Sequence, residues 1–220
     1  MSEASKLSLE ELKNAASRLV AAGESVREKL NDLTVEALAR RDLSEQEIRE
    51  VLTAITEGVS LGAAQRTEQV KIALTDALQG VDDALGHAAE AMQLTIGEVS
   101  SDLKAFNETE LQQGLQELKR LEELFIETVS KVASGASGLV QQEMAAIAEH
   151  GRRIGTDTGE RVRKVTDDLT QRIRDAAQGA ASSGKKAALE VSARVAERAG
   201  YKLGELAARL TEKAREMRKD

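Results

Sequence analysis

The sequence contains no proline, no cysteine and no tryptophan, and only two phenylalanines and one tyrosine among 220 residues. Without proline, the chain lacks the residue that interrupts helices most strongly. Without cysteine, it can form no disulfide, thiolate metal site or thiol nucleophile, which fits a reducing compartment. Because large aromatic rings dominate most globular cores, the core positions here must be mainly leucine, valine, isoleucine and alanine.

The residues that are present are typical of long helices. Charged residues make up 31% and hydrophobic residues 41% of the sequence, a mixture found in coiled coils and elongated helical proteins. The opening stretch, MSEASKLSLEEL, lacks the basic start and apolar run of a secretory signal. The longest uncharged stretch, 132–142, is about half as long as a membrane span requires. We therefore expect a cytoplasmic protein without a transmembrane segment.

The net charge of −7 is unevenly distributed along the chain. Residues 1–150 carry −13, from 14 Lys and Arg against 27 Asp and Glu, and residues 151–220 carry +6, from 17 against 11. This asymmetry indicates that the two parts attract each other or that the basic part contacts an anionic partner. The candidates for contact with an anionic surface are Arg161, Arg163, Lys164, Arg172, Arg174, Lys185, Lys186, Arg194 and Arg198.

Residues 70–103 form the most regular segment, because apolar residues recur there with an 11-residue period. Eleven residues in three turns keep an apolar stripe nearly straight along a helix. The segment carries acidic residues but no Lys or Arg between 72 and 103, so the pattern predicts a long, acidic, one-sided helix. Its rows are Val70/Val81/Met92/Leu103, Leu74/Leu85/Ile96 and Ala77/Ala88/Val99.

Two Ser-x-x-Glu capping boxes, at 8–11 and 44–47, mark helix starts. A heptad spacing of apolar residues follows the first box and predicts a helix over 8–41. The second box leads into the acidic segment, so the long acidic helix is expected over 44–106. The remaining segments are a flexible tail over 1–7, a third helix over 108–150 and a basic, glycine-interrupted amphipathic region over 151–220.

The predicted fold class is all-α: an elongated, coiled-coil-like bundle of three or four long amphipathic helices. Short joints at 41–44 and 106–108 favour antiparallel neighbours. The apolar seams must be buried within the chain or in a homo-oligomer, and the basic region is the candidate to cover the acidic helix. The predicted interface residues are Leu9, Leu12, Leu19, Val26, Leu30, Leu33, Val70, Leu74, Val81, Leu85, Met92, Ile96, Leu103, Leu111, Leu115 and Leu118.

Glycines change the pattern in two ways. They cluster near 134–138, 151–159 and 179–184, where their helix-weakening effect predicts kinks or breaks. Gly58 and Gly62 instead lie four residues apart in a strongly helical segment, a spacing seen where helices pack closely. We interpret this pair as a packing surface.

The sequence favours no enzyme and no metal or cofactor site. His87 and His150 are its only histidines, and neither has the glutamate three residues earlier that helical dimetal sites use. No phosphate-binding glycine loop is present. Adjacent carboxylates do not face each other on a helix, so we interpret two acidic pairs as solvated: Asp82 with Asp83, and Glu122 with Glu123.

The basic region does not favour nucleic acid as a partner. Eleven acidic residues are interspersed among its cations, and Tyr201 is its one aromatic residue. Nonspecific binding to single strands generally combines cations with several stacking rings. An amphipathic basic helix is better suited to a lipid surface, so a peripheral lipid or granule surface remains a candidate partner.

The 11-residue rows of 70–103, the scarcity of aromatic residues and the absence of a signal resemble two groups of surface-coating proteins. These are the exchangeable apolipoproteins and the bacterial phasins, which coat polyester storage granules. The resemblance is compositional, covers most of the chain and carries over no functional residue. It implies amphipathic helices that can lie on a hydrophobic surface.

Two functions follow as expectations. The first is a non-enzymatic structural or scaffold protein that acts through helix–helix self-association. The alternative is a phasin-like coat protein that binds a hydrophobic or anionic surface, such as a polyester granule, lipid or membrane.

Overall fold

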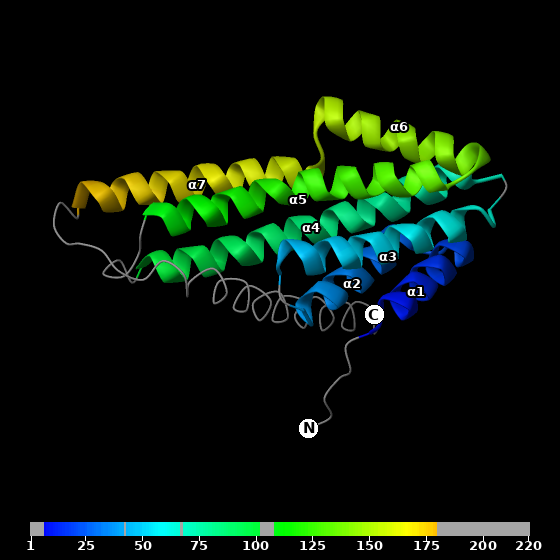
Figure 1. Ribbon diagram of the computed structural model, residues 1–220, viewed down its shortest axis with the longest axis horizontal. Helices are drawn as coiled ribbons and strands as arrows, with labels where there is room; N and C mark the ends of the chain where they lie inside the picture. Colours follow the sequence, from blue (N-terminus) through cyan, green and yellow to red (C-terminus); the bar gives the residue numbers. More distant parts are fainter. Residues whose placement is uncertain (1–6, 42, 67, 102–107, 180–220) are drawn as a thin grey trace, which may run out of the picture.

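The computed structural model describes residues 7–41, 43–66, 68–101 and 108–179, and these residues are all-helical. They form seven α-helices and no strand (Figure 1). The helices are α1 (Leu9–Ala22), α2 (Val26–Ala39), α3 (Glu45–Ala63), α4 (Val70–Ser101), α5 (Glu108–Gly135), α6 (Gly138–Ile154) and α7 (Asp157–Gly179).

Helix α4 contacts most of the other helices. Its 32 residues span about 48 Å at 1.5 Å per residue, and α4, α5 and α7 run lengthwise through the molecule (Figure 1). Helix α2 packs against α4, and α1 packs against α3, which in turn contacts α5. Helices α6 and α7 each contact both α4 and α5. The long helix is therefore enclosed by elements from both ends of the described chain.

Both serine capping boxes begin helices at the expected residues. Ser8 Oγ accepts a hydrogen bond from the Glu11 N–H at 3.2 Å, and the Ser8 N–H donates to the Glu11 carboxylate at 2.8 Å. Ser44 Oγ accepts from the Glu47 N–H at 3.4 Å. Because these bonds satisfy N–H groups that a helix start leaves unpaired, they fix the starts of α1 and α3.

The heptad helix expected over 8–41 is divided into α1 and α2. Gly23 ends α1 with φ at 76°, and its N–H donates to the Leu19 carbonyl at 3.2 Å. Ser25 follows with φ at 45°. A left-handed backbone conformation cannot continue an α-helix, so the chain turns here although the apolar spacing is regular.

The acidic helix expected over 44–106 is also divided, at residues 64–69. The N–H groups of Gln65 and Arg66 bond to carbonyls three residues earlier, at 3.2 and 3.0 Å. Such bonds tighten the end of α3 into a turn, and α4 then runs back beside it (Figure 1). The end of the expected helix and the joint before residue 108 lie outside the described residues.

The third helix expected over 108–150 consists of α5 and α6. The break falls between Gly135 and Gly138, and Gly138 has φ at 60°. A further break separates α6 from α7 at Gly155, whose φ is 98°. The kinks predicted at the first two glycine clusters are thus confirmed, and the third cluster lies beyond the described residues apart from Gly179.

Gly58 and Gly62 allow α1 and α3 to approach closely. A Cβ atom at Gly58 would overlap the Lys13 carbonyl oxygen and lie 2.8 Å from the Ala16 Cβ. A Cβ atom at Gly62 would overlap the Ser17 carbonyl oxygen. The interpretation of this pair as a packing surface is confirmed, because no residue with a side chain fits without moving α1.

We predict that Gly58→Ala lowers the free energy of unfolding by about 1–3 kcal/mol, because the added methyl group must displace backbone. Urea unfolding followed by circular dichroism measures the change. Gly135→Ala is the control, since nothing lies within 4 Å of its added Cβ. We expect the control to leave stability unchanged or raise it by up to about 1 kcal/mol. An equal loss in both variants would contradict the close approach.

Candidate functional site

The apolar stripe of α4 is buried inside the chain. Val70, Leu74, Val81, Leu85 and Met92 are all at most 6% exposed. Helices α2, α3, α5, α6 and α7 contact α4, and together they cover the described part of the stripe. This part of the stripe therefore needs no second copy of the protein to be buried.

The other predicted interface residues are placed less uniformly. Leu9 was predicted to lie in a helix interface, but its side chain is exposed. It is the first residue of α1, where the helix begins at the surface. The side chains of Ile96, Leu103, Leu111 and Leu115 lie outside the described part of the structure. The rest are buried or partly buried against one common core: Leu12, Leu19, Val26, Leu30, Leu33 and Leu118.

Helix α7 covers acidic α4 and comes from the same chain, but its own charge is balanced, with five Lys and Arg against five Asp and Glu. Val162 and Val165 are the buried apolar side chains of its first turns, at 3% and 4% exposed. Arg161 Nη1 lies 3.4 Å from Glu90 Oε1 on α4. Apolar burial and charge complementarity therefore both hold the first half of α7 in place.

Two carboxylates from other helices bind the N-terminus of α7, an arrangement termed the α7 anchor. Asp82 of α4 accepts hydrogen bonds from the Asp157 N–H at 2.8 Å and the Thr158 N–H at 3.2 Å. Glu122 of α5 accepts from the Thr156 N–H at 3.0 Å. A helix start has no internal partners for these N–H groups and carries partial positive charge. The two carboxylates thus satisfy hydrogen bonds and helix dipole together.

Two threonines and a glycine complete the α7 anchor. Thr158 Oγ1 donates to the Asp82 carbonyl oxygen at 2.7 Å, and Thr156 Oγ1 accepts from the Gly159 N–H at 3.0 Å. A Cβ atom at Gly159 would overlap the Glu122 carboxylate. Gly159 is therefore needed for the close approach of Glu122.

The interpretation of the acidic pairs as solvated is wrong for three of their four members. Asp82 is 7% exposed within the α7 anchor, and Glu122 is only partly exposed beside it. The Asp83 side chain is only 18% exposed and binds the guanidinium of Arg27. Of the four residues, Glu123 alone lies exposed on the surface. The sequence did contain a helix-start signal, Gly155-Thr156-Asp157, but it does not indicate which distant carboxylates bind there.

Burial raises the pKa of the Asp82 carboxyl group above its ordinary value. Desolvation is the main cause, and the hydrogen bonds from Thr158 and Asp157 oppose it by favouring the ionised form. The folded state therefore binds a proton at Asp82 more readily than the unfolded state does. Ionisation of Asp82 therefore destabilises the folded state relative to the unfolded state, and the hydrogen bonds only partly offset this effect.

Arg27 connects three helices next to the α7 anchor. Its Nε and Nη2 atoms, on α2, lie 2.7 and 3.0 Å from the carboxylate oxygens of Asp83 on α4. Its Nη2 atom also lies 3.9 Å from Asp157 of α7. On the same side of α4, a hydrogen bond with His87 and then the charges of Arg161 and Lys164 lower the pKa of Glu90. Charge pairing thus continues along the α4–α7 contact.

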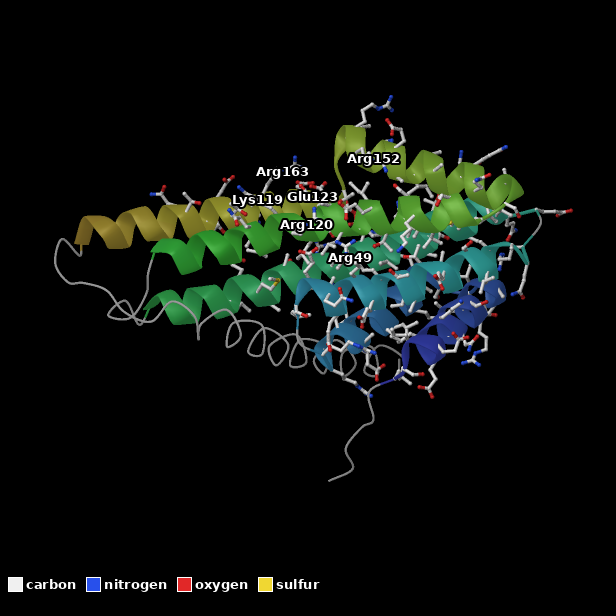
Figure 2. All side chains as sticks on the ribbon, viewed as in Figure 1. Arg49, Lys119, Arg120, Glu123, Arg152 and Arg163 are labelled. Atoms are coloured by element: carbon white, nitrogen blue, oxygen red, sulfur yellow. The ribbon has the colours of Figure 1, made fainter. Side chains whose placement is uncertain are left out.

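The cations considered for an anionic surface fall into three groups. Arg161 is partly buried and paired with Glu90, so it is engaged within the chain. Arg163 and Lys164 are exposed on α7, and Figure 2 shows Arg163 on the outer side of that helix. The side chains of the others lie outside the described part: Arg172, Arg174, Lys185, Lys186, Arg194 and Arg198.

A second charged cluster joins α3 to α5 (Figure 2). Arg49 lies 2.9 Å from Glu45 and 3.3 Å from Glu127, and Arg120 lies 3.6 and 3.4 Å from the same two residues. Arg120 also contacts Glu123 at 2.5 Å. Exposed pairs of this kind contribute about 0–1 kcal/mol each. The cluster therefore adds little to stability, although it links α3 and α5 through charge pairs.

The described residues contain no group of three or more His, Asp or Glu side chains that could hold a metal ion. Over the same residues, no helix is both long and apolar enough to cross a membrane. The chemistry of the site is that of helix–helix contact. Its carboxylates bind N–H groups and cations of other helices, and its aliphatic side chains pack against one another.

Comparison with known proteins places this chain, whose described residues are all-helical, in a family. Residues 2–212 match the family described as "Family of unknown function (DUF6781)", and the chain belongs to that family. No curated protein and no solved structure matches the chain. The functional conclusion therefore depends on the geometry of this chain.

We predict that Asp82→Ala lowers the free energy of unfolding by about 1–3 kcal/mol, because it leaves buried N–H groups of α7 without an acceptor. Amide hydrogen exchange over 156–165 should accelerate more than exchange in α1 and α3. Glu123→Ala is the control, since Glu123 is exposed, and surface changes of this kind stay within about 0.5 kcal/mol. Unchanged exchange in α7 of the Asp82 variant would disprove the α7 anchor.

The raised pKa of Asp82 predicts a pH dependence. Because the folded state retains the proton longer, the Asp82 contribution to stability is greatest at low pH and falls as pH rises from the unfolded pKa through the folded pKa. Asn cannot titrate, so the difference in unfolding free energy between wild type and Asp82→Asn should shrink as pH rises above about 4. Urea titrations at a series of pH values measure it. A difference that grows with pH would show that the sign is wrong.

Proposed function

We propose that the protein is a non-enzymatic scaffold of the cytoplasm, and that it acts through helix–helix self-association as an elongated, coiled-coil-like bundle. The absence of cysteine is consistent with that compartment. The observation that carries the proposal is a group of exposed apolar side chains at one end of the molecule.

This group, termed the apolar end, consists of Leu61, Ile72 and Leu139, which are 49%, 61% and 47% exposed. Leu61 lies two residues before the end of α3, Ile72 is the third residue of α4, and Leu139 is the second residue of α6. These three helix ends lie at the same end of the molecule (Figure 1). Exposed apolar groups gathered in one region are typical of protein–protein contact sites.

Self-association through the apolar end is compatible with the burial of the α4 stripe. The described part of that stripe is covered within the chain, so it does not offer a seam to another copy. The apolar end keeps its side chains exposed after folding. A homo-oligomer formed there would join copies end to end and extend the long axis of the molecule.

The test compares two sets of substitutions. The triple variant Leu61→Glu, Ile72→Glu, Leu139→Glu adds charge to the apolar end, and we expect light scattering to show monomers where the wild type forms oligomers. The control is Leu94→Glu with Ile154→Glu, which are 51% and 61% exposed but lie away from that end. A monomeric wild type, or a triple variant that still assembles, would contradict the scaffold proposal.

The alternative function, a coat on a hydrophobic or anionic surface, is favoured by one feature of α7. Among its described side chains, Val162 and Val165 are the buried large apolar ones, and polar contacts with α4 and α5 accompany them at Thr156, Thr158 and Arg161. A charged surface could therefore compete for this helix. The same samples should be sedimented with anionic vesicles and with polyester granules. The scaffold function predicts that the protein stays in the supernatant, and the coat function predicts that it pellets in a salt-sensitive manner.

A further inference from the structure

A cavity of about 460 Å³ lies between α4, α5 and α6, next to the α7 anchor. Leu78 of α4 and Phe125 and Val129 of α5 form apolar parts of its wall, and each is at most 5% exposed. Small-molecule sites commonly have volumes of about 300–1,000 Å³ and mostly apolar walls. The cavity therefore has the size and lining of a ligand site, and the scaffold proposal does not use it.

The cavity contains the only phenyl ring among the described residues, that of Phe125. Aromatic rings offer a large, rigid apolar face to a ligand. The α4 side of the cavity extends from Lys71 to Asp82, and these eleven steps correspond to about 16 Å of helix. An extended chain of roughly ten carbons fits along such a wall.

Carboxylates outnumber cations around the cavity. Asp82, Glu143 and Asp157 line it together with one ammonium, that of Lys71, and one imidazole, that of His150. Lys71 lies 3.9 Å from Glu143, so the Asp82–Asp157 end keeps the excess negative charge. Arg27, which is 3.9 Å from Asp157, already binds Asp83 through two hydrogen bonds.

Asp82 has no cation as a partner among the described residues. Its two oxygens accept hydrogen bonds from backbone N–H groups, and the α7 dipole compensates only about half a charge. Burial raises the pKa of this carboxyl group. A ligand cation close to Asp82 would supply the missing charge, whereas a ligand carboxylate would add to the repulsion.

We propose that this cavity binds an apolar primary amine, with its alkyl chain against Phe125 and its ammonium group at the Asp82–Asp157 end. The inference is independent of the scaffold proposal, because it concerns a partly open pocket between α4, α5 and α6 and not the apolar end. The negative charge of Asp82 and Asp157 disfavours a fatty acid, whose carboxylate would be repelled. A neutral alcohol of the same length measures the contribution of apolar contacts alone.

The experiment uses the full-length protein and three probes with the same chain: decylamine, decanoate and decanol below their micellar concentrations. Calorimetric titration and methyl NMR should show decylamine binding about tenfold more tightly than decanol, and decanoate more weakly than both. The methyl shifts should include Val129 and Leu78. Decanoate binding as tightly as decylamine, or no decylamine binding at about 1 mM, would overturn the proposal.

Two matched pairs of variants locate the site. Ala146 lines the cavity and Ala145 lines a different groove, and both are exposed on α6. Ala146→Phe should weaken decylamine binding about tenfold and Ala145→Phe should not. Asp157→Asn should weaken decylamine but not decanol, whereas Glu160→Gln should change neither. Equal effects within either pair would place the amine elsewhere and overturn the proposal.

Discussion

The arrangement of the last described helices depends on the hydrogen bonds between the α7 N-terminus and two carboxylates from other helices. A helix that begins inside a protein must find acceptors for its first N–H groups. Asp82 and Glu122 provide them at 2.8–3.2 Å. Because the acceptors belong to α4 and α5, the start of α7 is fixed against those helices. The turn at Gly155 allows α6, which precedes it, to pack on the same two helices.

Because the described α4 stripe is buried within the chain, it is not available as a surface for self-association. An exposed stripe would have required a partner along the length of α4, as in a coiled coil. The described stripe is instead enclosed by five helices of the same chain. Contacts between copies must then use surface features that remain after folding, which is why the three side chains of the apolar end carry the proposal.

Much of the helical content and the breaks at the glycine clusters could be predicted from local sequence, but the turns at 23–25 and 64–69 were not predicted. Ser8 and Ser44 marked helix starts, and Gly135, Gly138 and Gly155 marked breaks, because capping and glycine effects are local. Residues 64–69 contain neither proline nor glycine, and the apolar phase continues through them, so nothing local revealed the reversal. The role of Asp82 depends on a helix 75 residues away, and adjacent carboxylates alone gave no sign of it.

The most direct test of this account is a distance measurement between α4 and α7. The chain has no cysteine, so nitroxide labels on cysteines introduced at the exposed positions Leu94 and Asp168 would be the only ones present. The labelled protein should be diluted with unlabelled protein and measured by dipolar spectroscopy. A docked α7 predicts one narrow distance distribution, which broadens in urea. A distribution already broad without urea would contradict the account.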